Sequence, residues 1–287
     1  MFDFKYHIVS LVAVFLALGI GVVMGSMTAE RGVVTTQEKS LIATMEKDFE
    51  NLRATNKEQA AIIAADLAYT DASLPLLVRG KLTGKSIAVV VTGDVEAPTL
   101  KGLKAALEKA GATQASVTYL AAPLGLDNKD ILAKVAALLG VPGQSQAVVN
   151  SKVLAVTARA IVTGSDGAAL TSLADAGAIK TSGVYTSPAN GVIIIGGAEN
   201  GKYLKFAELD APLIKAFQAT GLSPVGAESA TVKNSYIKDY QSLNLSTVDN
   251  LDEAAGRVSV ILVLSGEPGH FGAKATADSL LPTPKSP

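Results

Sequence analysis

The stretch Lys85-Ser-Ile-Ala-Val-Val-Val-Thr92, followed directly by Gly93-Asp94, decides the fold class. Its β-branched and apolar residues do not alternate with polar ones, which is typical of a strand buried on both faces. Gly191-Val-Ile-Ile-Ile-Gly196 has the same character. Amphipathic helical patterns separate such runs. The sequence therefore predicts an α/β fold with a mostly parallel, Rossmann-like sheet between two layers of helices.

The rest of this region supplies the other expected elements. Further strands are predicted over 115–120, 224–228 and 257–264, with a short extended stretch at Ile179. Helices are predicted over 97–110, 129–139, 146–162, 166–176, 203–220 and 234–243. We expect this α/β domain to occupy residues 80–272. Residues 273–287 contain three prolines and no core pattern, so a disordered tail is expected there.

The N-terminal region differs from the α/β region in composition. Residues Ile8–Met27 carry no charge and reach the length of about 20 residues that spans a bilayer core. A cleaved signal peptide has a shorter apolar run and a clearer cleavage site, so we favour a retained anchor over residues 1–29. We expect the short N-terminus inside and the large domain outside. Gly21 and Gly25 form a G-x-x-x-G spacing, which permits close helix packing but is also common filler in apolar helices.

A helical pattern without Gly or Pro follows over 36–69, within an expected stalk at residues 30–79. A heptad repeat places seven residues on one seam, and five of them are apolar: Ile42, Met45, Phe49, Leu52, Asn56, Gln59 and Ile63. Asn56 at an a position fixes register in parallel coiled coils, and Asp48 would face Arg53 of a second chain. The pattern favours a homodimeric coiled coil about 50 Å long. The alternative is an amphipathic helix folded onto its own domain.

Composition excludes several classes of protein. The 287 residues have a net charge of −1 without a basic stripe, which argues against a nucleic-acid partner. The chain has no cysteine, so disulfides, thiolate catalysis and cysteine-ligated metals are excluded. It has two histidines, His7 and His270, which cannot form a three-histidine metal site within one chain.

No catalytic motif stands out. Ligands of doubly wound folds bind at the carboxyl ends of strands, where three glycine-rich turns are expected: 92–94, 196–201 and 265–269. None matches a dinucleotide or P-loop motif, and ordinary turn chemistry explains them. Asp249, Asp252 and Glu253 precede an expected strand and are interpreted as a turn and cap. We expect no enzyme and no bound cofactor. Soft ligands for copper are limited to Met24, Met27 and His270, with Met45 further along the chain.

Three segments resemble one known family. The first is His7-x-x-Ser10 with the apolar run to Gly25-Ser26, and the second is Ser246-Thr-Val-Asp249-Asn-Leu-Asp252 with Gly256-Arg-Val-Ser-Val-Ile-Leu-Val-Leu264. The third is Gly269-His270-Phe-Gly272. Together they closely resemble the MctB copper-transporter family. The order of anchor, coiled coil and α/β domain is similar as well, so the resemblance covers nearly the whole chain.

The resemblance implies a cell-envelope protein of copper homeostasis, described for the family as an outer-membrane transporter. A related member, SteB, is described as a coiled-coil membrane partner in cell separation. The resemblance thus implies copper as cargo, whereas the helical pattern alone favours the plasma membrane and a scaffold that holds an envelope protein partner. The sequence predicts a single-pass membrane protein with an extracytoplasmic α/β domain, with copper transport and a non-enzymatic scaffold as the two functional alternatives.

Overall fold

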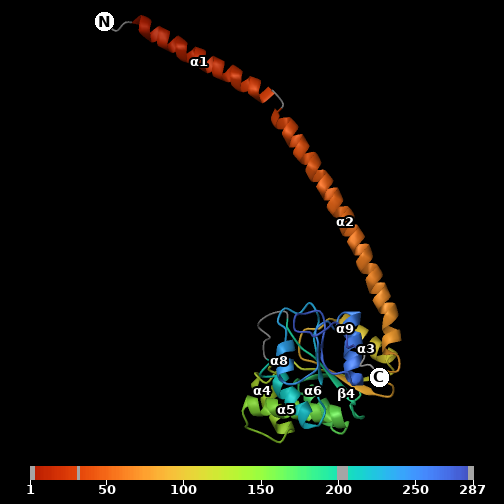
Figure 1. Ribbon diagram of the computed structural model, residues 1–287. Coiled ribbons are helices and arrows are strands. Elements are labelled where there is room, and N and C mark those ends of the chain that lie inside the picture. Colours follow the sequence, from red (N-terminus) through yellow and green to blue (C-terminus); the bar gives the residue numbers. More distant parts are fainter. Residues whose placement is uncertain (1–3, 31–32, 199–205, 284–287) are drawn as a thin grey trace. The chain divides into compact units, whose positions relative to one another are not determined.

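The computed structural model describes residues 4–30, 33–198 and 206–283 (Figure 1). The chain divides into two compact units, Met1–Ala65 and Asp66–Pro287. The first unit contains α1 (Phe4–Glu30) and most of α2 (Val33–Val78). The second contains the end of α2 and the whole α/β fold.

Two helices are long and apolar enough to cross a membrane. The segment Tyr6–Met27 of α1 is the more apolar, and every side chain that the structure describes in it is exposed. The segment Glu38–Val78 of α2 meets the same criterion. Its N-terminal half, however, is rich in charged residues, and Leu74 and Val78 near its end are buried in the core of the second unit. These features make α1 the better candidate for a membrane span.

A seven-stranded sheet with the order β3-β2-β1-β4-β5-β6-β7 forms the centre of the second unit. All neighbouring strands pair in parallel except β2 and β3, which are antiparallel. The predicted α/β fold with a mostly parallel sheet is therefore confirmed. The strands are β1 (Ser86–Val91), β2 (Thr113–Tyr119), β3 (Lys180–Gly183), β4 (Gly191–Ile195), β5 (Val225–Ala227), β6 (Thr247–Val248) and β7 (His270–Phe271).

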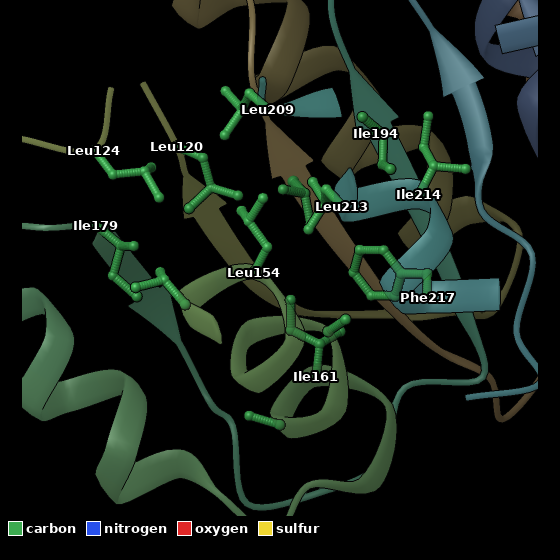
Figure 2. Close-up of a cluster of buried hydrophobic side chains, with 14 of the residues drawn as sticks. Leu120, Leu124, Leu154, Ile161, Ile179, Ile194, Leu209, Leu213, Ile214 and Phe217 are labelled. Carbon is green, nitrogen blue, oxygen red and sulfur yellow. The ribbon is translucent and has the colours of Figure 1, made fainter. Parts of the chain in front are cut away.

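Helices cover both faces of the sheet because alternate residues of its central strands point to opposite sides. Ile87, Val89 and Val91 belong to the core that contains the end of α2, α3 and α9. Ala88 and Val90 belong to the core formed with the helices of the other face. Figure 2 shows this second core, with side chains from β4, α5 and α7 meeting between the layers. The helices are α3 (Ala97–Lys109), α4 (Lys129–Leu138), α5 (Gln146–Thr163), α6 (Gly167–Asp175), α7 (Asp210–Ala219), α8 (Ile237–Ser242) and α9 (Ala254–Ser265).

One predicted strand is wrong: residues 257–264 form most of α9. Their β-branched sequence resembles a buried strand, but the preceding turn sets up a helix. Asn250 donates a side-chain hydrogen bond to Glu253, and Gly256 in the first turn lies against the backbone of Asn250, where a Cβ would overlap with it. Buried residues lie on several sides of α9, among them Val258, Val260 and Ile261, so the helix lacks a clear amphipathic pattern.

Two other boundaries differ from expectation. Helix α7 begins at Asp210 rather than at residue 203; residues 206–209 form turns, and 199–205 lie outside the described residues. The compact α/β unit begins before residue 80, because Leu74 and Val78 of α2 contribute to its core.

The expected disordered tail is also wrong for residues 273–283, the part that the structure describes. Gln241 donates a hydrogen bond to the carbonyl of Thr276, and Ser259 donates one to the carbonyl of Leu280. Ser279 forms a bridge with Phe271 of β7. Polar contacts hold this segment to the domain, so the absence of an apolar pattern did not reveal it.

Candidate functional site

The candidate site lies at the carboxyl ends of β1 and β4. These two strands are neighbours in the centre of the sheet, but the chain leaves β1 toward β2 and leaves β4 toward β5. Such a reversal of direction opens a crevice between the two connections, where ligands of open α/β sheets bind. The turns at 92–94 and 196–197 that the sequence analysis singled out both lie here.

Two glycines allow these turns to meet. The amide of Asp94 donates a hydrogen bond to the carbonyl of Gly197 at 3.1 Å, and the amide of Gly93 donates one to Ile195 at 3.1 Å. A Cβ on Gly93 would overlap with the backbone of Gly196 and Gly197. Gly197 itself has φ +85°, a conformation that side-chain-bearing residues rarely adopt. Both glycines are therefore required by the geometry of the crevice.

A cavity of about 600 Å³ opens at this point. Its walls are formed by the ends of β1, β2 and β4, the start of β3, the loop after β2 and the start of α7. Apolar side chains and small residues dominate the lining, and the charged residues in it are Asp94, Lys180 and Asp210. The apolar lining includes Val91, Leu120, Leu124, Ile179 and Leu209.

Asp210 is the buried charge of the cavity. It is 1% exposed, lies at the first residue of α7, and accepts two hydrogen bonds on Oδ1. Thr92 donates one at 2.6 Å, and the hydroxyl of Tyr240 donates the other at 2.7 Å. The carboxylate thus joins the end of β1 to α7 and α8.

Burial changes the acidity of this pair. Removal from water raises the pKa of Asp210 to about 6, although the hydrogen bonds from Thr92 and Tyr240 act in the opposite direction. Burial also raises the pKa of Tyr240 well above its usual value, and the neighbouring carboxylate of Asp210 adds to that effect. Asp210 therefore changes its protonation near neutral pH, whereas Tyr240 stays protonated and remains a donor.

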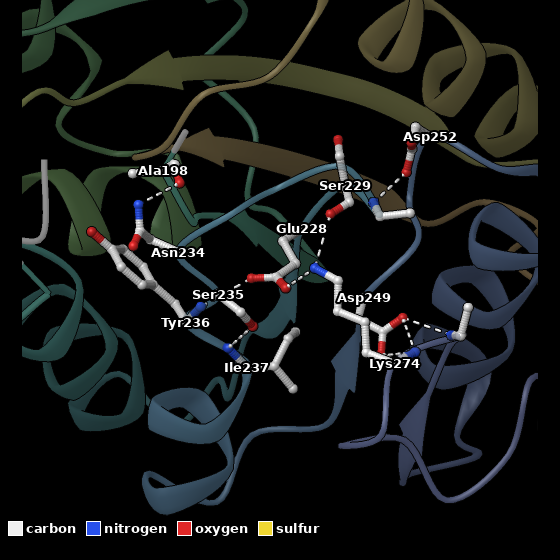
Figure 3. A network of polar contacts seen from close by, with 12 residues as sticks. Ala198, Glu228, Ser229, Asn234, Ser235, Tyr236, Ile237, Asp249, Asp252 and Lys274 are labelled. Carbon is white, nitrogen blue, oxygen red and sulfur yellow. Dashed lines mark hydrogen bonds and ion pairs between the residues drawn. The ribbon is translucent and has the colours of Figure 1, made fainter. Parts of the chain in front are cut away.

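A second polar cluster lies along the same edge of the sheet, at the ends of β5, β6 and β7 (Figure 3). Glu228 is fully buried and forms an ion pair with Lys274, with 2.5 Å between Oε1 and Nζ. The amide of Tyr236 donates a second hydrogen bond to Glu228 at 3.0 Å. Asp249 accepts from the amides of Ala273 and Lys274, at 2.7 Å and 3.1 Å. These contacts hold the segment after β7 against the ends of β5 and β6.

The second and third sequence motifs meet in this cluster. Thr247 of β6 and His270 of β7 are hydrogen-bonded through Oγ1 and Nδ1 at 3.1 Å. A Cβ on Gly272 would overlap with the carboxylate of Asp249, so this position requires glycine. Asp252 accepts from the amide of Ala230 at 2.7 Å. The motif residues thus connect three adjacent strand ends, which gives them a structural role.

The soft-ligand candidates lie on different elements: Met24 and Met27 on α1, and His270 on β7. His270 lies in the two-residue strand β7. Among the described residues, no group of three or more His, Asp or Glu side chains could hold a metal ion. A copper site at Met24, Met27 or His270 stays a prediction.

The predicted seam lies on α2 in the first unit. All five of its apolar side chains are between 49% and 59% exposed in this single chain: Ile42, Met45, Phe49, Leu52 and Ile63. The polar seam residues Asn56 and Gln59 are exposed on the same helix. The pairing of two chains stays a prediction.

The third glycine-rich turn does not belong to the site. Residues 266–269 lie between α9, which ends at Ser265, and β7, so this turn is at the amino ends of the parallel strands. This misplacement follows from the wrong strand assignment at 257–264. Residues 199–201 of the second turn lie outside the described residues.

Sequence reasoning missed Asp210, Tyr240, Glu228 and Lys274. Glu228 directly follows a predicted strand, which was a usable signal for the carboxyl edge of the sheet. Asp210 fell inside a predicted helix that began too early, so its position at a helix start was hidden. Tyr240 and Lys274 had no local signal, because their partners lie 30 and 46 residues away in the chain.

Comparisons with known proteins identify one family. The profile of the family described as "Copper transport outer membrane protein, MctB" matches residues 1–282. No curated protein matches the chain significantly. Similar solved structures include a mitochondrial ornithine carbamoyltransferase from Coccidioides immitis, which is 11% identical in sequence. The match covers 70% of this chain and 89% of that chain, with a TM-score of 0.17. A protein assigned as an aspartate carbamoyltransferase from Trypanosoma cruzi has 11% identity, 70% and 90% coverage and a TM-score of 0.15. TM-scores this low carry no argument.

Proposed function

The chain belongs to the MctB family, and on that premise we propose that it serves copper transport in the cell envelope as a membrane-anchored protein. The observation that carries the proposal is the extent of the match, which includes both long helices and the α/β domain through residue 282. The family is described as an outer membrane copper transport protein. In the proposed arrangement, α1 is a single membrane span and the α/β domain lies on the extracytoplasmic side.

The proposed role is transport of copper without tight storage and without catalysis. Thioether and imidazole groups are the soft ligands that this chain offers to copper, since it has no cysteine. Met24 and Met27 are three residues apart and therefore share one face of α1. We expect the full-length protein to bind Cu(I) no more tightly than micromolar. Competition with a chelator of known affinity measures this binding.

The function is tested by the copper content of cells that lack this chain. We expect their copper content to change under copper excess while their zinc content stays the same, and expression of the full chain to restore it. An unchanged copper content would contradict copper transport. A variant with both methionines replaced, M24L/M27L, keeps the apolar helix and separates loss of thioether ligands from loss of the anchor.

A second candidate function is a dimeric scaffold in the envelope. The observation that favours it is the row of exposed apolar side chains on α2, centred on Phe49 and Leu52. Association of two α2 helices would bury this row, and Asn56 of each chain would satisfy the amide of the other. A paired stalk would then present two α/β domains to an envelope protein partner. Cross-linking at Leu52, described below, tests the pairing.

A further inference from the structure

The cavity at the ends of β1 and β4 has the construction of a ligand site. It lies at the point where the chain reverses its direction along the sheet, and its 600 Å³ are enough for a small organic molecule. Gly93 and Gly197 have no side chains, so at these two positions the backbone itself lies close to the floor of the cavity. Most of its walls are apolar, and a few polar groups converge in it, which is the usual composition of small-molecule sites.

The most buried charged group of the cavity lining that the structure describes is a carboxylate, and it has no cationic partner among the described residues. Asp210 is 1% exposed and receives hydrogen bonds from two neutral hydroxyls, those of Thr92 and Tyr240. Within the described residues, lysine and arginine form ion pairs with other carboxylates but not with Asp210. An ionised carboxylate in such surroundings is stabilised by a positive charge that reaches it from the cavity.

Other groups of the lining agree with a cationic ligand. Tyr119 and Tyr236 also line the cavity, and the faces of tyrosine rings attract organic cations. Among the described residues of the lining, the lysine is Lys180, which is exposed and lies on β3, two strands away from β1. At about 4.8 Å per strand, its backbone is about 10 Å from that of β1. Because Lys180 is exposed, it belongs to the rim of the cavity.

We propose that this cavity binds a small organic amine in its protonated form, with the ammonium group at the carboxylate of Asp210 and the apolar body against the cavity walls. The site is independent of the copper function proposed above, because it uses no soft ligand and no residue of α1 or of the predicted seam. Its ligand is recognised by charge and by an apolar body of limited size.

Three compounds with four carbon atoms each test the proposal: n-butylammonium, 1-butanol and butyrate. Binding is measured by ligand-observed nuclear magnetic resonance on the full-length protein in nonionic micelles without copper, with empty micelles as the blank. We expect n-butylammonium to bind at least about tenfold more tightly than 1-butanol, and butyrate to bind more weakly than either. Equal binding of all three, preference for butyrate, or no binding would overturn the proposal.

Matched variants assign the effect to the carboxylate. D210N keeps an oxygen acceptor for Thr92 and Tyr240 but removes the charge, so n-butylammonium should lose its advantage over 1-butanol. K180M removes a charge at the rim and should leave the preference for the amine in place. A121F places a ring at an exposed lining position and should block all three compounds without touching Asp210. If D210N fails to fold, retention of amine binding by A121F contradicts the site, and its loss supports it.

Discussion

The hydroxyl of Tyr240 donates a 2.7 Å hydrogen bond to Oδ1 of Asp210, and both residues are buried. To reach this carboxylate from α8, Tyr240 crosses the end of β4 and lies against β5. A Cβ on Gly196 or on Gly226 would overlap with its side chain. The bond between helices α7 and α8 therefore depends on two glycines, one directly after β4 and one within β5.

Removal of this hydroxyl should destabilise the α/β unit. Y240F keeps the buried ring but leaves Asp210 with one donor, so we expect the free energy of unfolding to fall by about 1.5–3 kcal/mol. Urea unfolding of the full-length protein, followed by tyrosine fluorescence, measures the change. Y119F is the matched control, because Tyr119 is 38% exposed and its hydroxyl makes no hydrogen bond within the described residues. An equal effect of the two substitutions would contradict the assigned role.

The elevated pKa of Asp210 predicts a pH-dependent stability. The pKa is about 6 in the folded chain, against an ordinary value of 3.8, so between these values the folded state binds more protons than the unfolded state. Stability contributed by this group therefore falls as the pH rises from about 4 to about 6, by about 3 kcal/mol. D210N removes this dependence and should gain stability relative to the wild type across that range.

Urea unfolding at a series of pH values measures this difference. D127N is the control, because Asp127 is an exposed carboxylate outside the cavity. Parallel pH profiles of D210N and the wild type would show that Asp210 does not titrate in this range.

The buried ion pair predicts a large asymmetry between single and double substitutions. K274M leaves the fully buried Glu228 without its cation and should lower the free energy of unfolding by about 3–5 kcal/mol. The double variant E228Q/K274M removes both charges and should recover much of that loss. K104M is the control, because Lys104 and Glu108 form an exposed pair at 4.0 Å that contributes at most about 0.5 kcal/mol. Equal stability of K274M and the double variant would argue against the ion pair.

The predicted pairing of α2 helices can be tested with single cysteines, since the chain has none of its own. L52C should cross-link two chains in membranes, because Leu52 is an apolar seam residue of the heptad. K47C and E50C lie outside the seam and should react far less. Equal cross-linking at all three positions, or none at L52C despite normal expression, would contradict the dimeric coiled coil.

A charge in the middle of α1 should impair membrane anchoring. F15R places a guanidinium within the uncharged run and costs about 2.5–3.5 kcal/mol on an insertion scale, whereas F15L should be neutral. Alkaline carbonate extraction measures the fraction that stays in the membrane. A mature N-terminus near Ser26, read by sequencing of the protein, would instead show that the apolar run is a cleaved signal.

The central strands could be predicted because their sequences are unusual. The runs at β1 and β4 are long, apolar and bounded by glycine. The sequence therefore indicated both that they are strands and where their carboxyl ends lie. The run at 257–264 has the same composition but forms α9. A helix with several buried sides and a buried strand have similar sequences, and the turn that starts at Asn250 decides between them.

The short strands and most of the site residues could not be predicted from local sequence. β6 and β7 have two residues each, too few to show a period. Asp210, Tyr240 and Lys274 acquire their roles from contacts distant in the chain, and their own sequence context does not mark them. The local signals were the glycine-rich turns at 92–94 and 196–197 and the position of Glu228 at the end of a predicted strand.

The ion pair between Glu228 and Lys274 also has a consequence for folding during synthesis of the chain. The two residues are 46 positions apart, so a ribosome adding about 5–20 residues per second makes Lys274 about 2–9 s after Glu228. During that interval β5 cannot be buried with an ionised Glu228 at its end without a large penalty. The nascent domain therefore keeps this edge hydrated until its C-terminal segment arrives, and its final closure is a late step of biosynthesis.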